Sequence, residues 1–139
     1  MPTGYSGTPL AKKLGLKDGM RVWFQDMPPS VLLEIAEAGV TLERLKKPVA
    51  PVHCAHVFVT RRKDLETAIK TLRPVLAQDG MIWVSWPKKA AKVETDISDN
   101  TIRDVVLKGD LVDVKVCAVD AIWSGLKMVI RKEARQAKR

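Results

Sequence analysis

The feature that most constrains the fold is a short apolar stretch that ends at a proline. Residues 81–86 are apolar except for one serine and do not alternate with polar residues, and Pro87, Lys88 and Lys89 follow them. Such a run is typical of a strand buried on both faces of a helix-covered parallel sheet. Because proline cannot donate a hydrogen bond to a sheet, we predict that the strand ends near Trp86, with both lysines at its carboxyl end.

Strand and helix patterns alternate along the rest of the chain. Strand patterns occupy residues 20–24, 41–45, 54–60, 111–119 and 126–132, and helical patterns occupy 9–14, 29–38, 65–77 and 101–107. Pro74 predicts a kink or a new first turn within 65–77, and Ser98 is the predicted cap of the last helix. This alternation predicts a mostly parallel sheet with helices on both faces, and the loop at 120–125 makes the last two strands an antiparallel hairpin.

We therefore expect a single Rossmann-like α/β domain. It would span residues 16–132, after an N-terminal arm and short helix at 1–15 and before a basic tail at 133–139. At 139 residues the chain is long enough to bury a full core without disulfides.

The charge of the chain bears on its partners. Lysine and arginine number 24 against 16 aspartates and glutamates, which gives a net charge of +8. A basic surface attracts polyanions, so we expect an anionic small molecule or, without sequence specificity, nucleic acid. No apolar run reaches the roughly 18 residues of a membrane span and no signal peptide is apparent, so we expect a cytoplasmic protein without membrane association. The oligomeric state is left open.

The two cysteines and two histidines do not indicate a metal site. Cys54 and Cys117 lie in apolar, strand-like surroundings and are predicted to be buried thiols. His53 and Cys54 would face opposite sides of a strand, and no second cluster completes a ligand set with His56. We therefore predict no metal and no nucleophilic cysteine.

The order of elements resembles the class I methyltransferases, which also end in an antiparallel hairpin. This resemblance implies S-adenosylmethionine as the cofactor. The residues that usually hold it are absent, because residues 25–30 contain two prolines instead of a glycine-rich loop. The predicted second strand likewise ends at Leu45, Lys46 and Lys47 instead of an acidic residue. No cofactor is therefore predicted, except under the alternative of a divergent methyltransferase.

Longer motifs resemble a small bacterial family catalogued as a domain of unknown function. These are residues 4–15 (GYSGTPLAKKLG), 83–89 (WVSWPKK), 114–120 (VKVCAVD) and 123–127 (WSGLK). They are spread over nearly the whole chain. The resemblance implies no activity, cofactor or substrate.

The candidate site lies where the predicted parallel strands end, since ligands of open α/β sheets bind at that edge. Seven residues are expected to converge there: Asp26, Thr60, Arg61, Ser85, Trp86, Lys88 and Lys89. Arg61 would bind an anion through two nitrogen atoms, the lysines would add charge, and Trp86 would offer a ring face. Alternatively, these charges are solvated and Trp86 packs under a helix. Trp123, in the hairpin loop, either covers the same edge or closes the core.

The main functional hypothesis is a non-catalytic domain that binds an anionic ligand or a partner at this edge. Two alternatives remain. One is a divergent S-adenosylmethionine-dependent methyltransferase, and the other is a basic protein associated with nucleic acid.

Overall fold

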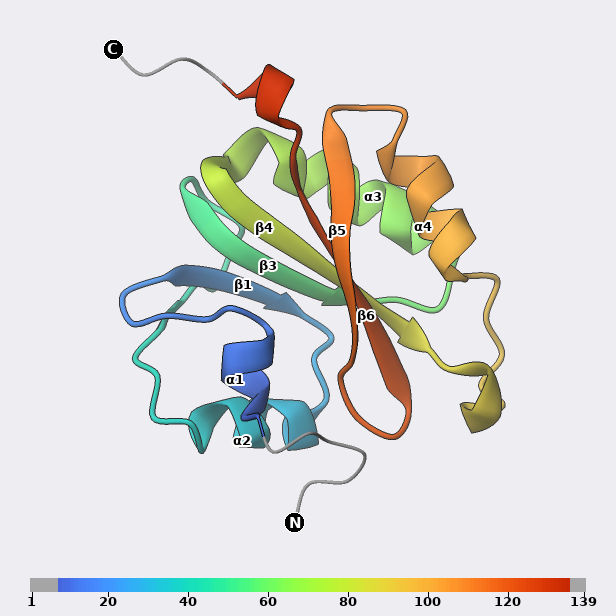
Figure 1. The fold of residues 1–139 in the computed structure, drawn as a ribbon, viewed down its shortest axis with the longest axis horizontal. Coiled ribbons are helices and arrows are strands. Elements are labelled where there is room, and N and C mark those ends of the chain that lie inside the picture. Colours follow the sequence, from blue (N-terminus) through green and yellow to red (C-terminus); the bar gives the residue numbers. More distant parts are fainter. Residues whose placement is uncertain (1–7, 136–139) are drawn as a thin grey trace.

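The chain folds around a six-stranded sheet in the computed structural model, which describes residues 8–135 (Figure 1). The strands are β1 (Arg21–Gln25), β2 (Glu43–Arg44), β3 (Val52–Phe58), β4 (Leu76–Pro87), β5 (Leu111–Ala118) and β6 (Trp123–Ile130). Their order is β2-β1-β3-β4-β6-β5. β2, β1, β3 and β4 pair in parallel, and β6 runs antiparallel to both β4 and β5. The predicted mostly parallel sheet with an antiparallel closing hairpin is confirmed.

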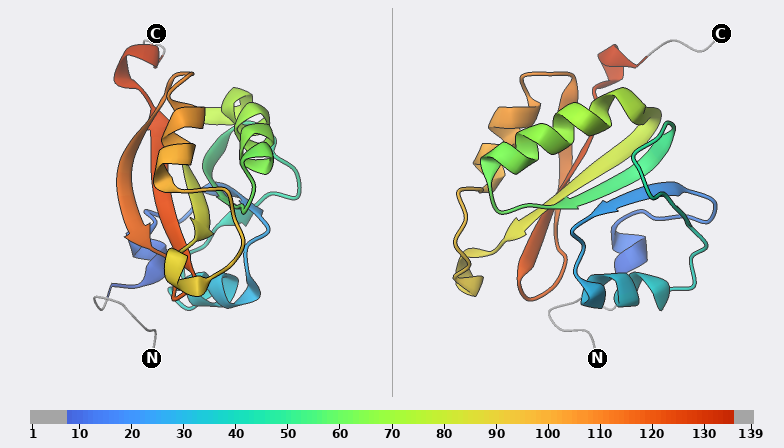
Figure 2. Two further views of the ribbon diagram at one scale, coloured as in Figure 1. Left: turned by 90° about the vertical axis from the view of Figure 1, so that its right-hand side faces the viewer. Right: turned by 180° about the vertical axis from the view of Figure 1, so that it is seen from behind.

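Helices cover both faces of this sheet (Figure 2). α1 (Leu10–Lys13) and α2 (Pro29–Ala36) lie on one face, and α3 (Arg62–Leu72) and α4 (Asp99–Val106) lie on the other. Three short 3-10 turns complete the described chain: η1 (Arg73–Val75), η2 (Lys89–Ala91) and η3 (Lys132–Ala134). The longest helix, α3, has eleven residues, and within residues 8–135 no helix has the length and apolar character needed to cross a membrane.

β4 is buried on both faces, as predicted from its composition. Met81 and Trp83 pack in the layer that α1 and α2 cover, whereas Ile82 and Val84 pack in the layer under α3 and α4. The indole Nε1 of Trp83 donates a hydrogen bond of 2.9 Å to the carbonyl oxygen of Leu14, just after α1. The central strand is therefore tied to the N-terminal helix by a polar contact as well as by packing.

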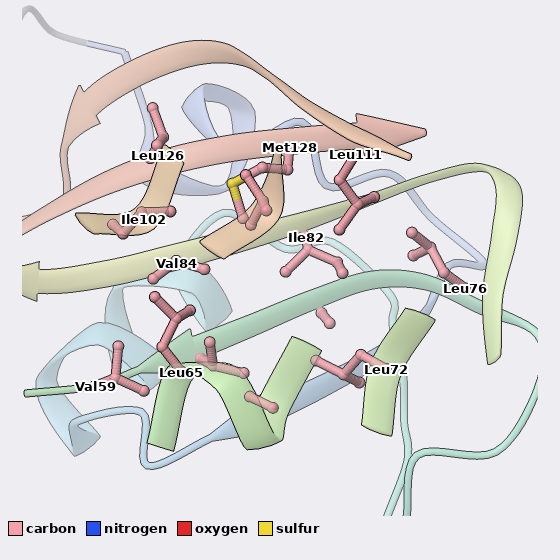
Figure 3. Close-up of a cluster of buried hydrophobic side chains, with 14 of the residues drawn as sticks. Val59, Leu65, Leu72, Leu76, Ile82, Val84, Ile102, Leu111, Leu126 and Met128 are labelled. Carbon is pink, nitrogen blue, oxygen red and sulfur yellow. The ribbon is translucent and has the colours of Figure 1, made fainter. Parts of the chain in front are cut away.

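Apart from Met128, the buried residues of the layer under α3 and α4 are aliphatic (Figure 3). Leu65 of α3 lies by Val84 of β4 in Figure 3, Leu72 lies on the side of Ile82, and Ile102 of α4 lies near Leu126 of β6. α4 begins where expected, since the hydroxyl of Ser98 accepts a hydrogen bond from the Thr101 amide and the Thr101 hydroxyl accepts one from the Ser98 amide. Such a reciprocal cap satisfies two amides that the helix itself leaves free.

The predicted helix over residues 65–77 is wrong at both ends. α3 starts at Arg62 and ends at Leu72. The new turn predicted at Pro74 is confirmed, because Pro74 lies in the 3-10 turn η1, which starts at Arg73. Leu76 already belongs to β4 and pairs with Val52. Residues 79–80 therefore also lie inside β4, in a segment where its register against β3 shifts.

Other boundaries differ by smaller amounts. β6 begins at Trp123 instead of residue 126, because the Asp120 carboxylate closes a tight turn by accepting hydrogen bonds from the Ile122 and Trp123 amides. The second strand is only Glu43–Arg44, both exposed at the sheet edge. Residues 1–7 of the predicted arm and 136–139 of the predicted tail lie outside the described residues.

Gly80→Ala is expected to lower the free energy of unfolding by about 1–3 kcal/mol, the usual cost of overpacking a core. An added Cβ would lie 2.8 Å from Leu76 Cδ1 and 2.9 Å from the Val52 carbonyl oxygen, and the backbone oxygen cannot rotate away. Urea denaturation measures the change. Gly109→Ala is the control, because its Cβ would meet only the Val106 carbonyl oxygen at 3.9 Å. Equal losses in the two variants would contradict this steric explanation.

Candidate functional site

A cavity of about 530 Å³ opens at the carboxyl ends of β1 and β3. Asp26 lines it from the loop after β1, Thr60 from the loop after β3, and Trp123 from the start of β6. α3 contributes Asp64, Thr67 and Thr71, and the strands contribute Trp23 and Phe58. We call this cavity the β1 pocket. It brings together three of the residues that the sequence placed at the sheet edge.

The β1 pocket is acidic. Asp26 and Asp64 line it, and none of its described lining residues is a lysine or arginine. Three threonines, three aromatic residues and Gln25 also line it, together with aliphatic residues and a proline. This set of groups suits a ligand with positive charge, hydroxyl groups and a ring, and it offers no cation to the anionic ligand expected at this edge.

Asp26 has an uncommon backbone conformation for a residue with a side chain. Its φ is 56°, in the left-handed region that favours glycine. The next residue, Met27, is buried, and Pro28 and Pro29 start α2. Non-glycine residues held in this region cluster at ligand sites. Here the left-handed residue stands directly after β1 and on the wall of the pocket.

The start of α2 is a poor anion site. Pro29 has no amide hydrogen, and the amides of Val31 and Leu32 both bond to the carbonyl oxygen of Pro28. A helix N-terminus binds phosphate through free amide groups. The amides of Val31 and Leu32 are therefore not free for a phosphate.

Aromatic rings form one wall of the β1 pocket and continue into the core. Phe58 meets Trp123 edge-to-face at 5.1 Å and stacks on His56 at 4.5 Å. Trp123 is half-buried in this contact, so it both closes the core and lines the pocket. The two predicted roles of Trp123 are thus combined.

Ser85 lies in the interior instead of at the edge. It is fully buried, and its Oγ is 2.7 Å from Nε2 of His56, which is also buried. Burial lowers the pKa of His56 to about 3, so the ring is neutral at pH 7. His56 Nδ1 is buried without a hydrogen-bond partner among residues 8–135. Sequence analysis missed this pair, although both residues are polar and lie inside apolar strand runs.

A second cavity, of about 560 Å³, lies beyond the end of β4. Trp86, Lys88 and Lys89 line it, together with residues at the start of α4 and Ser124 of β6. We call it the β4 pocket. Trp86 is half-buried and packs against the core under α3 and α4, which was the alternative stated for it.

Arg61 lines neither pocket. Its side chain is exposed and reaches the carboxylate of Glu94 at 3.9 Å. Its neighbour Arg62 makes the closer ion pairs, with Glu66 at 3.1 Å and with Asp104. Exposed pairs of this kind contribute little to stability.

The cysteines and histidines behave as structural residues. Burial raises the pKa of Cys54 to about 12, so its thiol is protonated and unreactive at neutral pH. Cys117, predicted as buried, is half-buried at the edge strand β5. Within residues 8–135, no three His, Cys, Asp or Glu side chains form a group that could hold a metal ion.

Several solved structures with a similar fold are methyltransferases. A structure from Sulfolobus solfataricus, assigned as a type 11 methyltransferase, matches 92% of this chain and 93% of its own length with a TM-score of 0.60. A SAM dependent methyltransferase from Aquifex aeolicus matches 87% of this chain and 88% of its own with a TM-score of 0.57. This chain has the methyltransferase fold. Sequence identity is 13% and 15%, so the likeness concerns the methyltransferase fold alone.

Other matches are less complete. LepI, solved in complex with SAM, matches 93% of this chain at a TM-score of 0.55 and 11% identity, but the chain spans only half of LepI. No protein-family model matches the chain, and no curated protein matches its sequence. The resemblance to the small bacterial family therefore stays a prediction.

Proposed function

We propose that this protein is a divergent S-adenosylmethionine-dependent methyltransferase that binds its cofactor in the β1 pocket. One observation carries the proposal: an acidic pocket, free of lysine and arginine among its described residues, lies at the carboxyl ends of β1 and β3 in a methyltransferase fold. In open α/β sheets, ligands bind at that edge. This function replaces the non-catalytic domain as the better-supported hypothesis.

The chemistry of the β1 pocket fits this cofactor. S-adenosylmethionine carries a positive sulfonium and ammonium, a ribose with two hydroxyls, and an adenine ring. Asp26 and Asp64 would hold the cationic groups and the ribose hydroxyls, and the threonines would donate to its carboxylate. The rings of Trp23 and Trp123 would contact the adenine. The pocket volume of about 530 Å³ is in the range of small-molecule sites.

The protein departs from the usual cofactor site at two positions. Asp26, with φ of 56°, supplies the left-handed turn after β1 for which other sites of this class use glycine. Glu43, the acid of the second strand, is bound to Arg21 at 2.8 Å. In its place, Asp64 in the first turn of α3 faces the pocket. The proposed site is therefore divergent in sequence but retains an acid on each side.

When bound, the cofactor supplies a methyl group on a sulfonium. The protein supplies the groups that orient the cofactor and an apolar wall beside it. Methyl transfer is a displacement that depends on alignment of the two reactants. The edge-to-face rings of Phe58 and Trp123 form an apolar part of the pocket wall. Asp26 and Asp64, fixed on different elements, would orient the cationic end of the cofactor.

Equilibrium dialysis with labelled S-adenosylmethionine tests the proposal. Saturable binding with a micromolar Kd is expected. Asp26→Asn should weaken it by about 10-fold or more, since a hydrogen bond to a charged group contributes about 1.5–3 kcal/mol. Asp79→Asn is the matched control, because Asp79 is an exposed carboxylate on β4 that does not line the β1 pocket. Absence of saturable binding up to millimolar cofactor, or equal losses in both variants, would contradict the proposal.

A further inference from the structure

The β4 pocket has the opposite chemistry to the β1 pocket. Lys88 and Lys89 line it, and Trp86 presents a half-buried ring to the same cavity of about 560 Å³. A third lysine, Lys92, lies in the loop between Lys89 and Val93, both of which line the pocket. Cations beside an aromatic ring are the pattern expected from the sequence, but the structure places them here, apart from Asp26 and Thr60.

The lysines of this pocket are not neutralised by neighbouring acids. Lys88, Lys89 and Lys92 form no ion pair within residues 8–135. Asp99 is the only acid among the described lining residues. One of its oxygens accepts a hydrogen bond of 3.0 Å from Arg103 and the other accepts one of 2.9 Å from the Asn100 amide.

The next acids along this loop are also engaged. Glu94 lies 3.9 Å from Arg61, and an oxygen of Asp96 accepts a hydrogen bond from the Arg62 amide at 2.7 Å. The two lining lysines, with a carboxylate already paired with Arg103, leave the pocket with a positive potential. Because the walls of a cavity exclude water, such charges attract an anion more strongly than dispersed surface lysines do.

The ring of Trp86 adds a second kind of contact. One part of it packs against the core under α3 and α4, which fixes its orientation, and the rest faces the cavity. Val93, 44% exposed, lies on the same wall. A fixed, partly exposed aromatic ring beside lysines binds a flat base by stacking while the lysines bind phosphate.

We infer that the β4 pocket binds a nucleotide, with its base against Trp86 and its phosphate between Lys88 and Lys89. The nucleotide is either free or part of a single-stranded nucleic acid, since both present the same base and phosphate. This binding does not depend on methyl transfer. Trp123 and Ser124, consecutive residues of β6, line one pocket each, so the two pockets lie on either side of this strand.

Titration of mononucleotides and of a fluorescent ten-nucleotide single strand tests this inference. Calorimetry measures AMP and UMP, and fluorescence anisotropy measures the strand. The double variant Lys88→Gln/Lys89→Gln should weaken binding by about 10-fold or more, and Trp86→Ala by about 5-fold or more, the lower bound for loss of one stacked base. Thermal unfolding followed by circular dichroism checks that each variant is folded.

The control is Lys70→Gln/Lys108→Gln, which removes the same two positive charges from exposed positions outside the β4 pocket. It should change affinity by less than about 2-fold. If AMP or UMP binds and the β4-pocket variants weaken that binding, the ligand is a free nucleotide. If only the single strand binds and is weakened, the ligand is nucleic acid. Equal loss in both double variants would show general electrostatic attraction and overturn the inference, as would no binding of any probe. S-adenosylmethionine binding to the Lys88→Gln/Lys89→Gln variant, measured by dialysis, should be unchanged. This measurement distinguishes failure of nucleotide binding from failure of cofactor binding in the β1 pocket.

Discussion

Trp83→Ala is expected to lower the free energy of unfolding by about 3–5 kcal/mol, the usual cost of removing a large buried aromatic side chain. Trp83 is fully buried in the layer between the sheet and α1 and α2. The substitution would leave a cavity and would also leave the Leu14 carbonyl oxygen without the indole donor that now lies 2.9 Å away. Chemical denaturation monitored by circular dichroism measures the loss.

Trp83→Phe separates packing from hydrogen bonding. The phenyl ring fills most of the space but cannot donate to Leu14, so this variant should lose less stability than Trp83→Ala. Its loss should include the roughly 1–3 kcal/mol of leaving a buried carbonyl unsatisfied. Amide exchange in α1 should rise in both variants, because α1 is held by this bond. If Trp83→Phe were as stable as the native protein, the hydrogen bond would have no part in fixing α1.

Acidification from pH 6.5 to pH 5 is expected to destabilise the protein through His56. Burial holds the pKa of His56 at about 3 in the folded state, against 6.5 for an ordinary histidine. Below pH 6.5 the unfolded chain therefore takes up a proton that the folded protein does not, and the free energy of unfolding falls by up to about 1.4 kcal/mol per pH unit as the pH drops toward 3. Urea denaturation at several pH values measures this slope.

The variant His56→Gln shows whether the slope belongs to this histidine. Its stability should depend less on pH between 6.5 and 5, even if it is less stable at every pH. Asp104 and Asp110 have lowered pKa values because Arg62 and Arg73 donate to them, so their stabilisation is lost only at lower pH, through and below 3.8. The same slope in both proteins would show that His56 is not the titrating group.

The fold could be predicted because burial of β4 leaves a simple signature. The near absence of polar residues between Met81 and Trp86 is typical of a strand covered by helices on both faces. The boundary between α3 and β4 was mistaken because Leu72 and Leu76 keep a four-residue, helix-like spacing. Pairing of Leu76 with Val52, far apart in sequence, decides its conformation, and no local pattern contains that information.

Sequence analysis predicted residues of the candidate site but not that they line two separate pockets. The strands carry Asp26 and Thr60 to one edge, as parallel pairing requires. The antiparallel strand β6 then places Trp123 beside Pro87, so the hairpin divides that edge into two pockets of opposite charge. Asp64 and Thr67 were missed because their contribution depends on how α3 packs. Ser85 can be buried because its hydroxyl has a hydrogen-bond partner in His56. That pairing depends on the register of β3 against β4, which the sequence does not show.

The positions of the β1 pocket residues along the chain determine how a bound ligand would affect unfolding. Trp23, Thr60 and Trp123 are contributed by the first, middle and last thirds of the chain. A molecule bound among them contacts all three segments, so none of the three can unfold locally without losing contacts to the ligand. Ligand at 100 times its Kd would add about 2.7 kcal/mol to the free energy of unfolding. Occupancy would then slow proteolysis throughout the molecule, far from the pocket itself.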